Sequence, residues 1–102
     1  MLSCVEIRRS AGGLRLFVRP PAALSWNARL GYDRVSELLE AIRQTESCTV
    51  PDVALTFVPD QRTGEAVLKC ETGSVLLDAE EVATLSTALR AHMPDRMRPL
   101  PV

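Results

Sequence analysis

The stretch Gly73-Ser-Val-Leu-Leu-Asp-Ala-Glu-Glu-Val82 decides the fold, because a short apolar strand runs directly into the start of a helix. Asp78 can accept a hydrogen bond at the N-cap, and Glu81 follows it with the spacing of a capping box. Apolar residues recur on one face of the segment that follows, at Val82, Leu85 and Leu89. Pro94 ends this helical pattern. The pattern predicts a helix over 79–92 that packs against a sheet.

Two segments near the N-terminus are predicted to form a β-hairpin. Residues 4–9 and 14–19 alternate apolar and polar side chains, and the glycines of Ser10-Ala-Gly-Gly13 suit a tight turn between them. Pro20-Pro21 ends the second strand, because proline has no N–H to donate to a sheet. The stretch 20–32 shows no clear period, so we expect a loop there.

The rest of the chain adds one helix and three strands. An apolar stripe predicts a helix over 33–46, with Asp33 as its cap. Short apolar segments separated by turn residues predict strands over 53–58, 65–70 and 74–77. The order is therefore ββαβββα, and the tight turns imply antiparallel neighbours. We expect an α+β fold with a five-stranded, mostly antiparallel sheet and two helices.

Length and composition predict one globular domain. The 102 residues are 46% hydrophobic and 25% charged, which is ordinary for a folded domain. We place the domain at 1–93 and a proline-rich, extended tail at 94–102. No apolar run reaches the roughly 18 residues of a membrane helix. With three cysteines and no visible export signal, the sequence predicts reduced thiols, a cytoplasmic location and no membrane partner.

The sequence carries no recognisable catalytic or cofactor motif. Three cysteines and the one histidine match the ligand inventory of a zinc site, but no two of them have the spacing of a zinc knuckle: Cys4, Cys48, Cys70 and His92. No serine stands in a nucleophile-elbow motif, and no glycine-rich loop resembles a phosphate-binding sequence. We therefore expect no enzymatic activity, no cofactor and no metal.

Charge is unevenly distributed along the chain. Residues 1–36 carry six arginines against Glu6 and Asp33, whereas residues 37–95 carry eleven acidic groups against four basic ones. One face of the predicted hairpin would gather Arg8, Arg15 and Arg19 around Phe17. Such a face suits single-stranded nucleic acid, with phosphates on arginine and a base stacked on phenylalanine. The acidic remainder of the domain opposes that interpretation.

A second candidate surface is apolar. Val58, Val67 and Leu76, together with Phe17, are expected to form a half-apolar face of the sheet. In one expected arrangement, helix 33–46 covers this face and the fold has three layers. Alternatively, both helices share the other face and leave an exposed patch of the kind that marks protein contacts.

These features favour a non-enzymatic protein-binding domain that acts through a sheet face, a sheet edge or an acidic surface. Its expected contact residues are Arg8, Arg15, Phe17, Arg19, Val58, Val67 and Leu76. The partner is another protein or, as an alternative, a second copy of the chain. A domain that binds single-stranded nucleic acid through the hairpin is the second hypothesis. In size and class the chain is similar to small bacterial and phage interaction proteins, including inhibitors and immunity proteins, which is an analogy of architecture alone.

Overall fold

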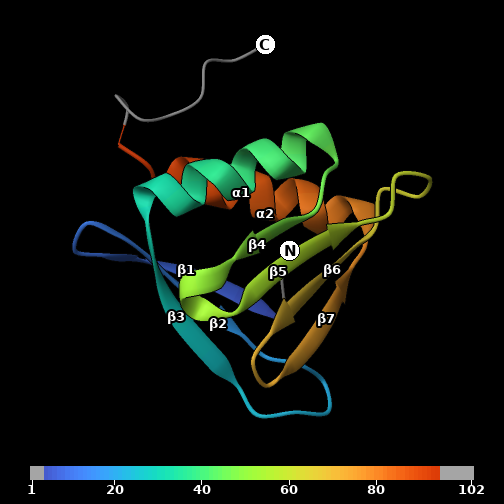
Figure 1. Cartoon of the computed structure of the whole chain (residues 1–102), viewed down its shortest axis with the longest axis horizontal. Coiled ribbons are helices and arrows are strands. Elements are labelled where there is room, and N and C mark those ends of the chain that lie inside the picture. The colour runs from blue at the N-terminus through green and yellow to red at the C-terminus, as the bar shows by residue number, and fades with distance from the viewer. Residues whose placement is uncertain (1–3, 95–102) are drawn as a thin grey trace.

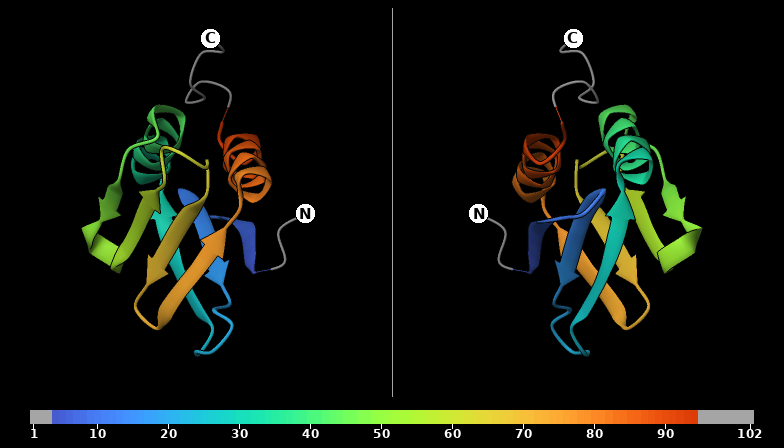
Figure 2. Two further views of the ribbon diagram at one scale, coloured as in Figure 1. Left: turned by 90° about the vertical axis from the view of Figure 1, so that its right-hand side faces the viewer. Right: turned by 90° about the vertical axis from the view of Figure 1, so that its left-hand side faces the viewer.

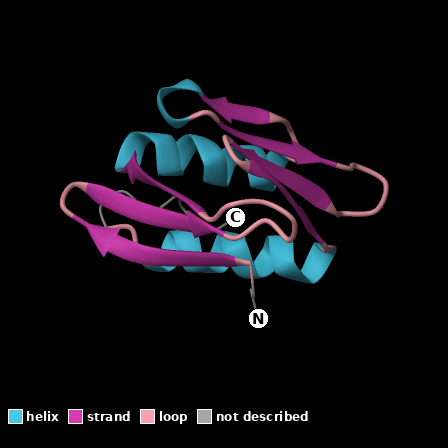
Figure 3. Cartoon of the chain, turned by 90° about the horizontal axis from the view of Figure 1, so that it is seen from below, coloured by secondary structure: helices cyan, strands magenta, loops and turns pink. Residues whose placement is uncertain are grey.

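Two antiparallel sheets face each other, and two helices lie side by side across one end of them in a computed structural model that describes residues 4–94 (Figure 1). The first sheet has the order β1-β2-β3, with β1 at Val5–Ser10, β2 at Gly13–Val18 and β3 at Trp26–Gly31. The second has the order β4-β5-β6-β7, with β4 at Cys48–Val50, β5 at Leu55–Pro59, β6 at Ala66–Cys70 and β7 at Gly73–Leu77. Seen from below, each sheet lies under one side of the helix pair (Figure 3).

The helix that follows β7 begins as its sequence predicts. In α2 (Ala79–Ala91) the Asp78 carboxylate accepts a hydrogen bond from the Glu81 N–H at 2.8 Å. The Glu81 carboxylate accepts one from the Asp78 N–H at 3.2 Å. The capping box is therefore confirmed, and it satisfies two backbone donors that a helix start leaves open.

The other helix begins differently from the prediction. The N-cap of α1 (Tyr32–Gln44) is Gly31, and no side chain caps it. Asp33 was expected to be the cap, but it lies in the first turn. Its negative charge there complements the positive end of the helix dipole instead.

The expected single five-stranded sheet is wrong. Residues 4–94 form two sheets with seven strands in the order βββαββββα, interrupted by a short 3-10 helix, η1 (Pro51–Val53). Two strands were missed. β3 lies inside the stretch 20–32 that was expected to be a loop. β4 has three residues and is followed at once by proline, so it offers too short a pattern to detect. Within residues 4–94 no backbone ladder joins the two sheets, and α1 connects β3 of the first sheet to β4 of the second.

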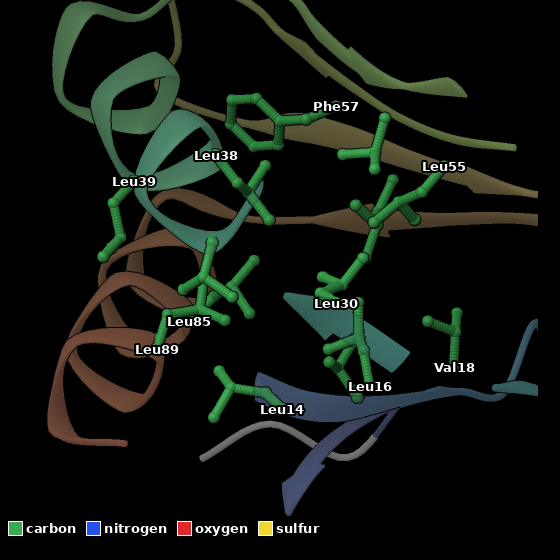
Figure 4. Packing of buried hydrophobic residues seen from close by; sticks show 14 of the residues in the cluster. Leu14, Leu16, Val18, Leu30, Leu38, Leu39, Leu55, Phe57, Leu85 and Leu89 are labelled. Carbon is green, nitrogen blue, oxygen red and sulfur yellow. The ribbon is translucent and has the colours of Figure 1, made fainter. Parts of the chain in front are cut away.

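The core lies between the two sheets and under the helices (Figure 4). The first sheet contributes Leu14, Leu16, Val18 and Leu30, the second contributes Leu55 and Phe57, and the helices contribute Leu38, Leu39, Leu85 and Leu89. Leu85 and Leu89 are fully buried, which confirms the predicted stripe on α2. The alternation predicted for the first hairpin is confirmed as well, since its aliphatic residues lie on the inward face.

The three-layer arrangement does not form. α1 packs on the core side, against α2, β2, β3 and β4, and so it does not cover the outer face of the second sheet. Leu76 on that outer face is 64% exposed. The predicted tail falls almost wholly on residues 95–102, which lie outside the described part of the chain. Within residues 4–94, neither helix has the length and apolar character needed to cross a membrane.

Candidate functional site

The outer face of the first sheet gathers most of the arginines of the N-terminal third. Arg8 on β1 pairs with Arg15 on β2, and Arg15 pairs with Arg29 on β3, so the three side chains form a row across the strands. The next row along the sheet holds Glu6, Phe17 and Asn27. We call this surface the arginine face, defined by Glu6, Arg8, Arg15, Phe17, Arg19, Asn27 and Arg29.

Strand alternation and a tight turn build the arginine face. Gly12 has φ of 71°, a left-handed conformation that allows the turn between β1 and β2. The aliphatic residues of the hairpin point into the core, so Phe17 and the charged residues between them lie on the outer face. The prediction that Arg8, Arg15, Phe17 and Arg19 share one surface agrees with this register and with the ion pairs of Glu6.

Sequence reasoning missed Arg29. Its strand was expected to be a loop, although Trp26, Ala28 and Leu30 alternate with polar residues, which is the period of a half-buried strand. In the structure the Arg29 Nε donates to the Ala11 carbonyl at 2.9 Å, which ties β3 to the first turn.

The positive charge of the arginine face is only partly neutralised. Glu6 pairs with Arg8 at 3.2 Å and with Arg19 at 3.4 Å. Arg15 donates to the neutral Asn27 side chain at 2.7 Å. Within residues 4–94, no carboxylate pairs with Arg15 or Arg29. Like charges directly opposite each other on neighbouring strands are destabilising, so the row is an unfavourable arrangement that a bound anion would relieve.

Phe17 is the aromatic side chain of the arginine face, and it is already engaged. The Arg8 guanidinium lies over its ring, 5.1 Å from the centroid, which is a cation–π contact. Trp26, which pairs with Val18 at the next position of β3, points inward and is buried. Among the described residues, the arginine face therefore offers one aromatic ring, and a guanidinium group covers one side of it.

The apolar residues of the second prediction also come together, but without Phe17. Val58 pairs with Val67, and Val67 pairs with Leu76, so the three form one row across β5, β6 and β7 on the outer face of the second sheet. Phe17 lies on the other sheet, because the chain forms two sheets and not one. We call Val58, Val67 and Leu76 the apolar row.

The candidate metal ligands remain apart. Within residues 4–94, no three or more His, Cys, Asp or Glu side chains are grouped so that they could hold a metal ion. Cys4, Cys48 and Cys70 form no disulfide. His92 forms the C-cap of α2, where its Nδ1 lies 2.8 Å from the Ala88 carbonyl oxygen. That contact gives the ring a structural role at the helix end.

Cys48 is a thiol of low expected reactivity. Burial raises its pKa, and the nearby Glu37 carboxylate raises it further. Because the thiolate is the nucleophile, Cys48 should react with iodoacetamide at about pH 8 several-fold more slowly in the folded protein than in the urea-unfolded chain. Alkylation rates followed by peptide mass spectrometry test this, and equal rates in the two states would contradict it.

A polar cleft of about 590 Å³ lies between β3, the start of α1 and η1. Arg34 lines it and pairs with Glu37 at 3.1 Å and with Asp52 at 3.3 Å. These pairs join α1 to η1, and both carboxylates raise the pKa of Arg34. Arg34, Glu37 and Asp52 satisfy one another, so these groups offer weaker ligand chemistry than the arginine face.

No protein family, curated protein or solved structure matches this chain. The function is therefore inferred from its surfaces. The arginine face carries unneutralised charge, and the apolar row carries exposed hydrophobic area. Each has a distinct partner chemistry.

Proposed function

We propose that this chain is a non-enzymatic protein-binding domain that holds an acidic segment of its partner on the arginine face. The observation that carries the proposal is the cross-strand row of Arg8, Arg15 and Arg29, in which Arg8 alone pairs with a carboxylate of the described residues. Arginine presents a planar group that binds carboxylates through two parallel hydrogen bonds, and it is more weakly hydrated than lysine. A protein surface with regularly spaced Asp or Glu residues supplies the matching groups.

The spacing of the row suits an acidic helix that crosses the strands. Neighbouring strands lie about 4.8 Å apart, so the three arginines start from equally spaced backbone positions. A helix rises about 5.4 Å per turn, and carboxylates three or four residues apart lie on one side of it. One carboxylate per turn can therefore meet one arginine per strand.

Two features favour a protein over single-stranded nucleic acid. Proteins that bind single strands stack successive bases on aromatic side chains. Here Phe17 is the aromatic residue of the described face, and Arg8 already covers one side of its ring. Glu6 lies in the same row as Phe17, so a strand whose bases stack on this ring would carry its phosphates past a carboxylate. A helix that follows the row of Arg8, Arg15 and Arg29 lies one row away from it.

The test uses a fluorescein-labelled helical peptide with glutamate at every third or fourth position, titrated with the protein in about 50 mM salt. We expect binding, and we expect the double variant Arg15→Gln/Arg29→Gln to weaken it at least about tenfold. Each arginine would lose a charge-assisted hydrogen bond, and such bonds contribute about 1.5–3 kcal/mol. Fluorescence anisotropy gives the dissociation constants.

The matched control is Arg43→Gln/Arg62→Gln, which removes the same charge elsewhere. Arg43 lies on α1, where it pairs with Glu40 at 2.6 Å, and Arg62 lies in the turn between β5 and β6. This control should bind the peptide as the wild type does. An equal loss in both variants would show that net charge alone drives binding, and no binding by the wild type would also overturn the proposal. Tighter binding to an oligothymidine of about 20 nucleotides, with a steep dependence on salt, would support the nucleic-acid hypothesis instead.

A further inference from the structure

β7 is an edge strand with an open side. β6 pairs with it along one edge, and no strand of the described chain pairs with the other (Figure 2, left). Every second residue of an edge strand directs its N–H and C=O groups away from the sheet. Such groups form a template on which another strand can add.

The other sheet edges carry the usual protection against strand addition. β1 contains Glu6, Arg8 and Arg9, and β3 contains Arg29, so charges mark both edges of the first sheet. β4 has three residues and is followed immediately by Pro51. Charged residues, proline and short length all discourage pairing with another chain. β7 reads Gly-Ser-Val-Leu-Leu and has none of these features apart from its modest length.

The apolar row ends at this open edge. Val58 on β5 and Val67 on β6 are half-buried, whereas Leu76 on β7 is 64% exposed. Leu76 has the neighbouring side chain of Val67 on one side, and no strand of residues 4–94 provides a neighbour on the other. A strand added beside β7 would cover it.

A second exposed leucine lies at the opposite end of β7. Leu24 is 79% exposed, and its carbonyl oxygen accepts a hydrogen bond from the Thr72 hydroxyl at 2.7 Å. Thr72 immediately precedes β7, so Leu24 is held beside the start of the strand and Leu76 lies near its end. These two are the large apolar side chains that the described surface exposes most.

We propose that a second copy of this chain pairs with the open edge of β7 through its own β7, antiparallel and about a two-fold axis. Side chains on paired residues must share a face, so the register with full overlap places Val75 opposite the partner subunit's Val75 and Ser74 opposite the partner subunit's Leu76. The start of each strand then meets the end of the other. Leu24 of each copy thereby comes to the end of β7 where the partner subunit's Leu76 is exposed.

Self-complementarity is the reason to choose a second copy over a foreign strand. A two-fold interface uses the same patch on both subunits, so the patch must match itself when reversed. β7 has no charged residue that would face a like charge in the second copy. An exposed leucine lies near each end of the strand, Leu24 beside its start and Leu76 near its end. The product is one continuous eight-stranded sheet in which the apolar row of each copy ends beside the partner subunit's Ser74.

Sedimentation equilibrium of the full chain, from about 10 μM to about 1 mM, tests the proposal. We expect a dimer at the upper concentrations. Ser74→Lys/Leu76→Lys should raise the dissociation constant at least about tenfold, because both positions are exposed and lysines on an edge strand oppose pairing. Thr49→Lys/Thr56→Lys adds the same charge to the outer face of β4 and β5 and should leave the dimer unchanged.

Hydrogen exchange adds a readout of where the subunits meet. The β7 amides that point away from β6 should exchange several-fold more slowly at high protein concentration than at low concentration. A monomer at all concentrations, a dimer that survives the lysines on β7, or β7 exchange that is independent of concentration would each overturn the proposal. Arg15→Gln/Arg29→Gln should dimerise as the wild type does, so this test does not depend on the proposed function of the arginine face.

Discussion

Leu85→Ala and Leu89→Ala should each lower the free energy of unfolding by about 2–5 kcal/mol. Both side chains are fully buried between α2 and the rest of the core (Figure 4). Truncation removes apolar area from the core and leaves a cavity that the surrounding close-packed structure can fill only in part. The total stability of a domain this size is about 5–15 kcal/mol, so either change should remove a large share of it. Urea titration followed by circular dichroism measures the loss.

Thr87→Ala is the matched control for these two variants. Thr87 lies on the exposed side of the same helix, and alanine suits a helix interior better than threonine. Its effect should stay within about 0.5 kcal/mol. A loss below about 0.5 kcal/mol for Leu85→Ala or Leu89→Ala would show that α2 does not supply the core in the way that its burial indicates.

The sequence predicts those elements whose local signals agree with one another. The helix after β7 has a capping box, an apolar stripe and a proline stop, and the structure has it at Ala79–Ala91. The first hairpin has alternation on both strands and glycine at its turn, and it forms close to where it was expected. The sequence did not predict β3, because a proline pair and small residues precede this strand and obscure its short alternating pattern. The division into two sheets is a property of chain connection around α1, which no local pattern encodes.

The candidate sites show the same division between local and long-range information. Alternation within one hairpin is local, so three of the arginines could be assigned to one face from the sequence. Arg29 joins them through the pairing of β2 with β3, which depends on recognising that strand. Val58, Val67 and Leu76 could be grouped because hairpins connect their strands in order. Phe17 was grouped with them wrongly, because membership of a sheet depends on which strands meet across the whole fold.

Gly13→Ala should lower the free energy of unfolding by at least about 3 kcal/mol, the upper end of the cost of overpacking. The glycine pair of the first turn was expected to supply positive φ, which Gly12 does at 71°. Gly13 has a different role, because β3 approaches it closely. A Cβ there would overlap the carbonyl oxygen of Leu30 and lie 2.9 Å from its carbonyl carbon. Backbone atoms cannot rotate away as a side chain does, so β2 and β3 would have to separate where Gly13 pairs with Gly31.

Gly31→Ala separates this steric effect from the general effect of replacing glycine. Gly31 is the residue that pairs with Gly13, yet a Cβ added to it meets nothing within 4 Å. Its φ of −64° is one that alanine adopts freely. The change should therefore alter the free energy of unfolding by less than about 1 kcal/mol in either direction. Similar losses for the two variants in urea titrations would contradict the close approach of β3 to Gly13. A large loss of stability for Gly13→Ala alone would show that this close contact holds β3, the strand that carries Arg29, against β2.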